Sequence, residues 1–171
     1  MIVSIEELKS VTELSNISDE MLQTMCEGVE SFIRDYTNNN FINRNITFNT
    51  PSLNGKLEIV SSPFKVGDTI LISNSQYNNG VYVLKNVDGT LDKELYDDEN
   101  NKITLVQYPK AIKLGFIKLL QYNAQMDSKM GISSESISRH SVTYTQQSNN
   151  SIGGYPSHLM SFLRPYMKAR F

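Results

Sequence analysis

The sequence predicts an α+β fold, in which a small helical bundle carries an inserted, barrel-like antiparallel β-lobe. Apolar residues recur at helical spacing towards both ends of the chain. Between them, residues 41–107 change to short runs of β-branched and aromatic residues separated by turn residues. The chain has 171 residues, and 39% of them are apolar, which is enough for a packed core. We therefore expect a helical body with a C-terminal arm from residues 1–40 and 108–171, and a β-lobe from residues 41–107.

Composition argues against several classes of protein. No apolar run approaches the roughly 20 residues that span a bilayer, and the first residues lack the basic region of a signal peptide. A single cysteine excludes a disulfide scaffold. The formal net charge of −2 argues against bulk nucleic-acid binding. We therefore expect a soluble protein.

Two opening helices are predicted near the start of the chain. Ser4 and Glu7 fit a capping box, so a short helix is expected over residues 5–11. Ser18 is a second N-cap signal, with acidic residues in the turn that follows it. Apolar residues then recur on one face for about five turns before an asparagine run at residues 38–40 stops the helix. These apolar residues are Leu22, Met25, Cys26, Val29, Ile33 and Tyr36.

Residues 41–107 have the pattern of short antiparallel strands. Turn signals occur at Asn54-Gly55, Asn79-Gly80 and Asp88-Gly89. Both faces of the runs between them are partly apolar, which favours a small barrel or a curled sheet. The expected strands cover residues 46–48, 57–60, 69–73, 81–87 and 103–106.

A long central helix is predicted to begin at Pro109, because a proline in the first helical turn needs no N–H donor. Its apolar residues surround much of the helix, and Gly131 is the expected C-cap. Gly115 lies inside it at a cost of about 1 kcal/mol relative to alanine, which indicates a close packing contact.

The last part of the chain is predicted to be an arm followed by a short helix. Residues 132–155 are rich in Ser, Asn and Gly and indicate an extended polar arm with strand propensity, in which Gly153-Gly154 fits a hinge. Helix is expected again from Pro156. Because Pro165 disfavours a helix interior, this element should kink or end near Arg164.

The sequence contains no convincing catalytic or metal-binding pattern. Cys26 lies on an apolar helix face, and we expect a buried packing residue rather than a nucleophile working with His140 or His158. The acidic residues between Asp92 and Glu99 lack the ordered spacing of a calcium loop. We therefore expect no catalytic residue, no cofactor and no metal.

The C-terminal residues are the candidate partner-binding site. Aromatic and basic residues occur together there, and this composition is typical of interface anchors. The apolar stripe is also too short to form a stable helix unless some surface covers it. The competing interpretation is that the segment folds back on Leu119 and Leu120 and completes the bundle of its own subunit. The candidate residues are Leu159, Phe162, Arg164, Tyr166, Lys168 and Arg170.

Strings near both ends of the chain are similar to those of one family. They are SDEML at 18–22 leading to SFIRDYT at 31–37 and Phe41, ISSESISRHSVTY at 132–144, and GYP at 154–156 followed by Leu159, Leu163 and Pro165-Tyr166. In this order they resemble the head–tail connectors, or head-completion adaptors, of tailed bacteriophages and prophages. The resemblance covers about two thirds of the chain. In the β-lobe, FKVGDTI at 64–70 and NGVY at 79–82 resemble a small barrel insertion found in longer phage relatives.

The resemblance implies a structural virion protein and not an enzyme. Connector subunits form a ring, typically a dodecamer in the virion, beneath the portal protein. The ring extends the DNA channel without sequence-specific DNA binding and offers a docking surface for the stopper or tail-completion protein. The implied location is the head–tail interface of the virion, and the bacterial host cytoplasm during assembly, without a membrane.

The alternative function is a single-stranded nucleic-acid-binding module built on the β-lobe. Such a module needs exposed aromatic and basic side chains together on one surface. Tyr77, Tyr82 and Lys85 are candidates, but Asp88 and Asp92 follow them closely. Two function classes therefore remain, and the arrangement of aromatic and charged side chains on the lobe distinguishes them.

Overall fold

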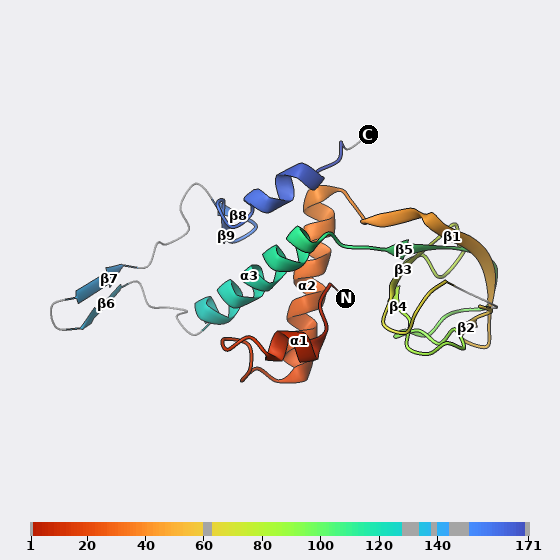
Figure 1. Cartoon of the computed structure of the whole chain (residues 1–171), viewed down its shortest axis with the longest axis horizontal. Coiled ribbons are helices and arrows are strands. Elements are labelled where there is room, and N and C mark those ends of the chain that lie inside the picture. Colours follow the sequence, from red (N-terminus) through yellow and green to blue (C-terminus); the bar gives the residue numbers. More distant parts are fainter. Residues whose placement is uncertain (1, 60–62, 128–133, 138–139, 144–150, 170–171) are drawn as a thin grey trace. The chain divides into compact units, whose positions relative to one another are not determined.

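The computed structural model describes residues 2–59, 63–127, 134–137, 140–143 and 151–169. The chain divides into two compact units. One unit, here called the β-lobe, is formed by residues 39–108, and the other, called the helical unit, contains residues 2–38 and the chain from Pro109 onward (Figure 1). The fold is mixed α+β, as predicted.

Both opening helices begin where the sequence predicts. Helix α1 (Ile5–Lys9) follows Ser4, whose hydroxyl oxygen accepts the Glu7 N–H at 3.2 Å. Helix α2 (Asp19–Thr37) follows Ser18 in the same way and ends at Asn38, which adopts a left-handed backbone conformation. Helix α1 is shorter than expected, because residues 10–17 form consecutive turns instead of continuing the helix.

The core of the helical unit lies between α2 and α3 (Lys110–Asp127), which pack against each other. Pro109 directly precedes α3, and its carbonyl oxygen accepts the N–H groups of Ile112 and Lys113. Burying these facing apolar stripes supplies the main stabilisation, because each fully buried side chain of this size contributes about 1.5–3 kcal/mol. The buried residues are Leu22, Cys26, Val29 and Ile33 of α2, and Ile112, Phe116, Leu119 and Leu120 of α3.

The chain after α3 contains two small hairpins and a short helix. Strands β6 (Ser134–Ile137) and β7 (His140–Thr143) pair antiparallel, which agrees with the predicted strand propensity of the arm. Gly131, the expected C-cap of α3, lies outside the described residues. Strands β8 (Ser151–Ile152) and β9 (Tyr155–Pro156) form a second antiparallel pair.

The last helix is a 3-10 helix, η1 (Ser161–Tyr166), and not a longer α-helix. Pro165 lies inside it and has no N–H with which to make an α-helical hydrogen bond to Ser161. The Leu163 N–H donates to the carbonyl of Met160, three residues earlier, at 3.1 Å. A hydrogen bond over three residues is the 3-10 pattern, whereas an α-helix uses four. The expected helix from Pro156 therefore begins later, and its first part is a turn.

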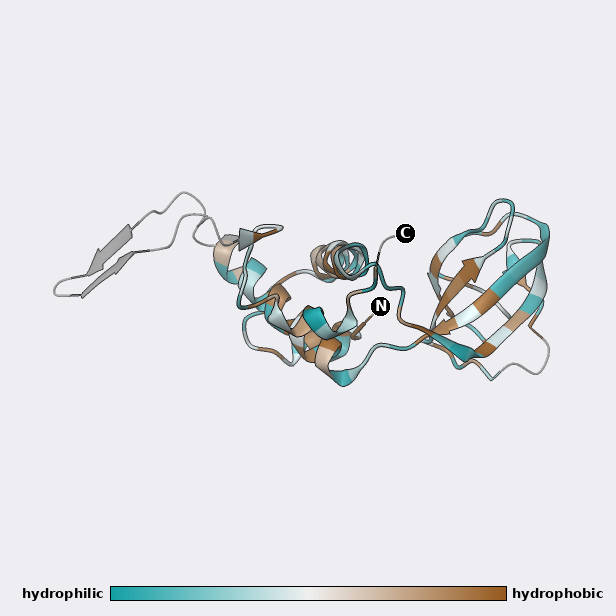
Figure 2. Cartoon of the chain, turned by 90° about the horizontal axis from the view of Figure 1, so that it is seen from above, coloured by the Kyte–Doolittle hydropathy of each residue, from teal (hydrophilic) through white to brown (hydrophobic). Residues whose placement is uncertain are grey.

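The β-lobe is a five-stranded antiparallel sheet that curls into a half-barrel (Figures 1 and 2). Its strand order is β2-β1-β5-β3-β4. Pairing between β1 and β5 shifts register at two places, and such irregularities bend a strand and increase its twist. The strands are β1 (Ile42–Leu53), β2 (Lys56–Leu57), β3 (Thr69–Ser73), β4 (Gly80–Val83) and β5 (Asp98–Val106).

Apolar side chains from all parts of the sheet form a separate core in the β-lobe, including Leu57, Ile70, Ile72, Leu84 and Ile103. The sequence predicts β3 with its observed bounds, whereas β1 and β5 are longer than expected. The expected strand over residues 81–87 was wrong at its end, because β4 stops at Val83. The carboxylate of Asp92 accepts the Val83 N–H at 2.8 Å and takes the place of a strand partner there.

Candidate docking surface on the C-terminal segment

The C-terminal segment, defined as residues 151–169, is fastened to α2 and α3 at three points. The first is Tyr155, which is buried and whose ring centroid lies 5.6 Å from that of Phe32 and 5.8 Å from that of Tyr122. The side-chain amide of Asn123 donates a hydrogen bond to the Tyr155 hydroxyl oxygen at 2.9 Å. Burial raises the pKa of Tyr155 above its ordinary value, and the hydrogen bond with Asn123 opposes part of this shift.

The turn that presents Tyr155 requires glycine. Gly153 and Gly154 both have positive φ angles, at 57° and 86°, which disfavours residues with a Cβ atom. A Cβ atom on Gly153 would also lie only 2.5 Å from ring atoms of Phe32. The glycine doublet therefore forms a tight turn between β8 and β9 and is not the hinge that the sequence predicts.

The second attachment point is η1, which lies on α2 and α3. Met160 and Leu163 are fully buried. The ring of Phe162 covers Gly115 of α3 so closely that a Cβ atom there would lie 2.3 Å from the ring. The sequence predicts a close packing contact at Gly115, and the contact with Phe162 confirms it.

The third attachment point joins the end of the segment to the end of α2. The Lys168 N–H donates to the carbonyl oxygen of Thr37 at 2.8 Å, and the side-chain amide of Asn38 donates to the carbonyl oxygen of Ala169 at 2.8 Å. One of these carbonyls belongs to the last turn of a helix, where carbonyl groups have no partner within the helix. The segment is therefore packed against its own helices, as the competing interpretation of the sequence proposes.

The candidate docking residues differ in what remains accessible. Arg164 and Lys168 are exposed, whereas Leu159, Phe162 and Tyr166 are half-buried against the unit. Arg170 lies outside the described residues. The accessible part of the candidate surface therefore consists of Arg164 and Lys168, here called the basic edge. Met167, which is 50% exposed, adds an apolar side chain to it.

The single thiol has the environment of a packing residue. Cys26 is buried in the core of the helical unit, as predicted. Burial, with a smaller contribution from the nearby carboxylate of Glu30, raises the pKa of the Cys26 thiol to about 11. A thiol with this pKa is a poor nucleophile at neutral pH, because the reactive thiolate is scarce. Among the described residues, no group of His, Cys, Asp and Glu side chains is arranged to hold a metal ion.

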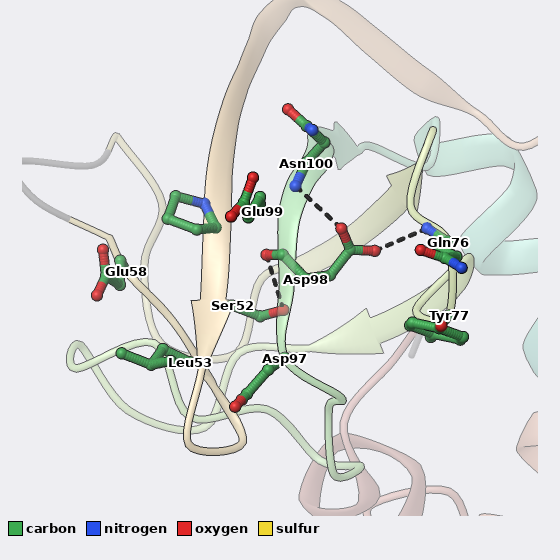
Figure 3. A pocket seen from close by; sticks show the side chains of 10 residues that line it. Ser52, Leu53, Glu58, Gln76, Tyr77, Asp97, Asp98, Glu99 and Asn100 are labelled. Atoms are coloured by element: carbon green, nitrogen blue, oxygen red, sulfur yellow. Dashed lines mark hydrogen bonds between the residues drawn. The ribbon is translucent and has the colours of Figure 1, made fainter.

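The β-lobe contains an open pocket of about 540 Å³ that sequence reasoning missed (Figure 3). Carboxylates surround it, and those of Asp97 and Asp98 accept hydrogen bonds from the lobe itself. Asp97 accepts the Asn54 N–H, and Asp98 accepts from the Ser75 hydroxyl and the Gln76 N–H. The hydrogen bonds to Asp98, first that from Ser75 and then that from the Asn100 N–H, hold the pKa of Asp98 below its usual value.

A buried polar network connects the strands and includes Ser52, which also lines the pocket. The Asn78 amide donates to the Ser52 hydroxyl, the Tyr96 carbonyl and the Asn101 side-chain oxygen at 2.8–3.2 Å. Asn101 donates in turn to Ser52 and to the carbonyl of Thr50. In the described part of the chain, every buried side-chain nitrogen and oxygen has a partner. The network therefore has a structural role.

The surface of this pocket does not suit a nucleic-acid backbone. Tyr77 and Tyr96 are 60% and 70% exposed, and their ring centroids lie 6.1 Å apart. Carboxylates, however, accompany these rings at the pocket: Glu58, Asp97, Asp98 and Glu99. A binding groove for single-stranded nucleic acid combines stacking rings with positive charge. The described residues that line the pocket provide one ring, that of Tyr77, and no positive charge.

Comparisons with known proteins name no family for the chain. The sequence matches no protein-family model, and no curated protein is significantly similar to it. Among the described residues, no helix is both long enough and apolar enough to cross a membrane.

Proposed function

We propose that the chain is a structural protein of a tailed bacteriophage or prophage, namely a head–tail connector subunit. In this proposal the helical unit is a small bundle that forms the body of the subunit. Copies of it form a ring beneath the portal protein, extend the DNA channel and provide the docking surface for the stopper or tail-completion protein. The β-lobe is an insertion in this body.

One observation carries most of the weight. Two of the stretches that carry the resemblance, residues 18–41 and 154–166, are far apart in the sequence, yet α2 contacts η1. The aromatic contact between Phe32 and Tyr155 joins the two stretches directly. Chance similarity of two separate strings does not require them to touch. Descent from a common connector body does require it, and this supports the proposal.

The basic edge of the C-terminal segment is the proposed contact with the portal or with the next subunit. Because Met160 and Leu163 are anchored in the core, this edge is presented on a packed segment. A preorganised surface loses less conformational entropy on binding than a loose tail does. Arg164 can bind a carboxylate of the partner bidentately, and Lys168 adds positive charge beside it.

The test measures complexes with the portal protein encoded by the same phage or prophage. Native mass spectrometry of the mixture should show portal rings that carry several copies of the chain. The double variant Arg164→Glu, Lys168→Glu should reduce this binding by about tenfold or more. A matched double variant in the β-lobe, Lys85→Glu, Lys102→Glu, should bind as well as the unchanged protein.

The two parts of the proposal fail differently. If the unchanged protein does not bind the portal, the connector function is wrong. If the C-terminal variant binds as well as the β-lobe control, only the docking edge is wrong. Circular dichroism of each variant shows whether the helices remain folded.

A further inference from the structure

The helical unit has opposite charges on its two halves. Residues 2–38 hold eight Asp and Glu but two Lys and Arg, whereas residues 109–171 hold eight Lys and Arg but two Asp and Glu. The net charge of the whole chain, −2, conceals this separation. Because both halves belong to one compact unit, the unit carries an acidic helix and a basic helix at the same time.

The basic charge of α3 lies on its exposed face, which we call the lysine face. Lys110, Lys113 and Lys118 are exposed, and at 3.6 residues per turn their spacing spreads them over a sector of about 140° around the helix. Leu114, 58% exposed, and the half-buried Ile117 lie between them. Within the described residues, none of the three lysines forms an ion pair. The lysine face thus has an apolar centre with a charged rim.

The acidic charge of α2 also lies on an exposed face, which we call the glutamate face. Glu20 and Glu27 are exposed, and their separation of seven residues equals about two helical turns or 10 Å. Neither carboxylate pairs with a cation among the described residues, although Glu27 accepts a hydrogen bond from Gln23. Met21, 56% exposed, lies at the edge of this face.

We propose that the lysine face of one copy binds the glutamate face of a second copy. The three lysines extend over about 12 Å of helix, which matches the spacing of the two glutamates. Leu114 and Ile117 of one copy would be covered by the second copy and surrounded by opposite charges, with Met21 of the second copy at the edge of the contact. This is the usual anatomy of a protein interface. The inference rests on the proposed function, because it names the contact between subunits of the ring.

Two different faces on one body produce a head-to-tail contact. Such a contact leaves one unused face on each end of a pair, so addition continues until a ring closes or a filament grows. A pair of identical faces would instead stop at a dimer. The separation of charge between α2 and α3 is therefore suited to a subunit that must form a ring.

A second copy fits the lysine face better than DNA does. Phosphate contacts need lysine and arginine but gain nothing from an exposed Leu114 or a half-buried Ile117. A protein partner buries these side chains and removes them from water. The same unit also provides the complementary carboxylates, which DNA binding would leave unexplained.

Zero-length crosslinking tests the contact directly. A carbodiimide joins lysine amines to carboxylates that touch, and a mixture of unlabelled and nitrogen-15-labelled protein separates crosslinks between copies from those within one copy. Mixed-isotope crosslinks between the α3 lysines and Glu20 or Glu27 are expected at low salt. They should fall severalfold at about 1 M salt, where the screening length is about 3 Å. The Lys9–Asp19 ion pair provides the internal same-copy control.

Charge reversal supplies a sharper test. The variants Lys113→Glu, Lys118→Glu and Glu20→Lys, Glu27→Lys should each lose self-association and mixed-isotope crosslinks by about tenfold or more. When the two variants are mixed, every contact between them is again between opposite charges, so association should return. The β-lobe variant Lys85→Glu, Lys102→Glu is the matched control and should behave like the unchanged protein.

Each outcome decides something. Loss in both single-face variants and recovery on mixing support the contact between faces. Variants that associate as well as the control, or a mixture that does not recover, overturn it. Loss of double-stranded DNA binding in the lysine variant, with association unchanged, overturns it in favour of DNA. Recovery on mixing without any ring on the portal retains the contact but refutes the connector function.

Discussion

The two units of this chain are held together by different physical means. In the β-lobe, the curled sheet encloses a polar network of Asn78, Asn101 and Ser52 beside its apolar core. In the helical unit, the described core is almost entirely apolar and aromatic, with Glu30 and Thr37 as its buried polar side chains. The lobe depends on hydrogen-bond geometry, and the helical unit depends on close packing.

This difference shows where each unit is sensitive. A buried hydrogen-bond network loses stability when one member is removed, because the remaining groups have no water to replace it. An apolar core loses stability in proportion to the cavity that a truncation leaves. Four substitutions, taken from the largest expected effect to the smallest, separate the two cases.

Leu163→Ala should give the largest effect. Leu163 is a fully buried residue of η1, which packs on α2 and α3. Its truncation should therefore lower the free energy of unfolding of the helical unit by about 2–5 kcal/mol. Urea unfolding followed by helical circular dichroism measures the loss, while amide exchange should show the β-lobe still protected. The neighbouring exposed Arg164→Ala is the control, with an expected change of about 0.5 kcal/mol or less. Equal values for the two variants would mean that the segment is not part of the core.

Asn78→Ala should destabilise the β-lobe by about 1–3 kcal/mol, because the Asn101 side-chain oxygen and the Tyr96 N–H lose their hydrogen-bond partner and the Ser52 hydroxyl loses one of its donors. Amide exchange is the suitable measurement, since it reports each unit separately. Protection should fall in strands β1 and β5 and stay constant in α2. The exposed Asn100→Ala is the matched control. A loss of protection in both units would refute the separation of their stabilities.

The sequence predicts those features of both units that depend on neighbouring residues. Ser4 and Ser18 identify the starts of α1 and α2 because an N-cap acts on the next three residues. The bounds of β3 follow similarly from a short run, Thr-Ile-Leu-Ile-Ser, in which β-branched residues predominate. These are local effects, and local sequence is sufficient to find them.

The features that sequence reasoning misses depend on distant partners. Asn78 and Asn101 have the composition of turn residues, and their burial depends on how β1 and β5 curl around them. Gly115 predicts a close contact, but nothing near it in the sequence identifies Phe162 as the partner. Composition likewise predicts the docking residues, and whether each one is accessible depends on how η1 packs.

Gly115→Ala should have an effect whose sign depends on Phe162. Alanine favours a helix by about 1 kcal/mol over glycine, but the added Cβ would overlap the Phe162 ring and cost about 1–3 kcal/mol. We therefore expect a net loss of about 1 kcal/mol in the unchanged background. In a Phe162→Ala background the overlap is gone, and the same substitution should stabilise the helical unit by up to about 1 kcal/mol. A urea-unfolding cycle with the four proteins measures this. Stabilisation in both backgrounds would show that the ring does not cover Gly115.

The smallest expected effect is a dependence of the helical unit on alkaline pH. The pKa of Cys26 is raised from 9.0 to about 11 by burial and by Glu30, so the folded chain retains the thiol proton at pH values where the unfolded chain releases it. Stability should therefore be unaffected below about pH 8 and fall as the pH rises from about 9 towards about 11. Cys26→Ala removes the titrating group and should flatten this part of the profile, although it also costs packing energy at every pH. The comparison to make is the difference in unfolding free energy between pH 8 and pH 9.5 for each protein, because this difference cancels the packing cost.

The β-lobe has no cysteine, so its amide protection should give the same pH profile in both proteins once the intrinsic exchange rate is corrected. An equal fall in stability with and without Cys26 would assign the alkaline sensitivity to other groups, and the thiol would then contribute only packing.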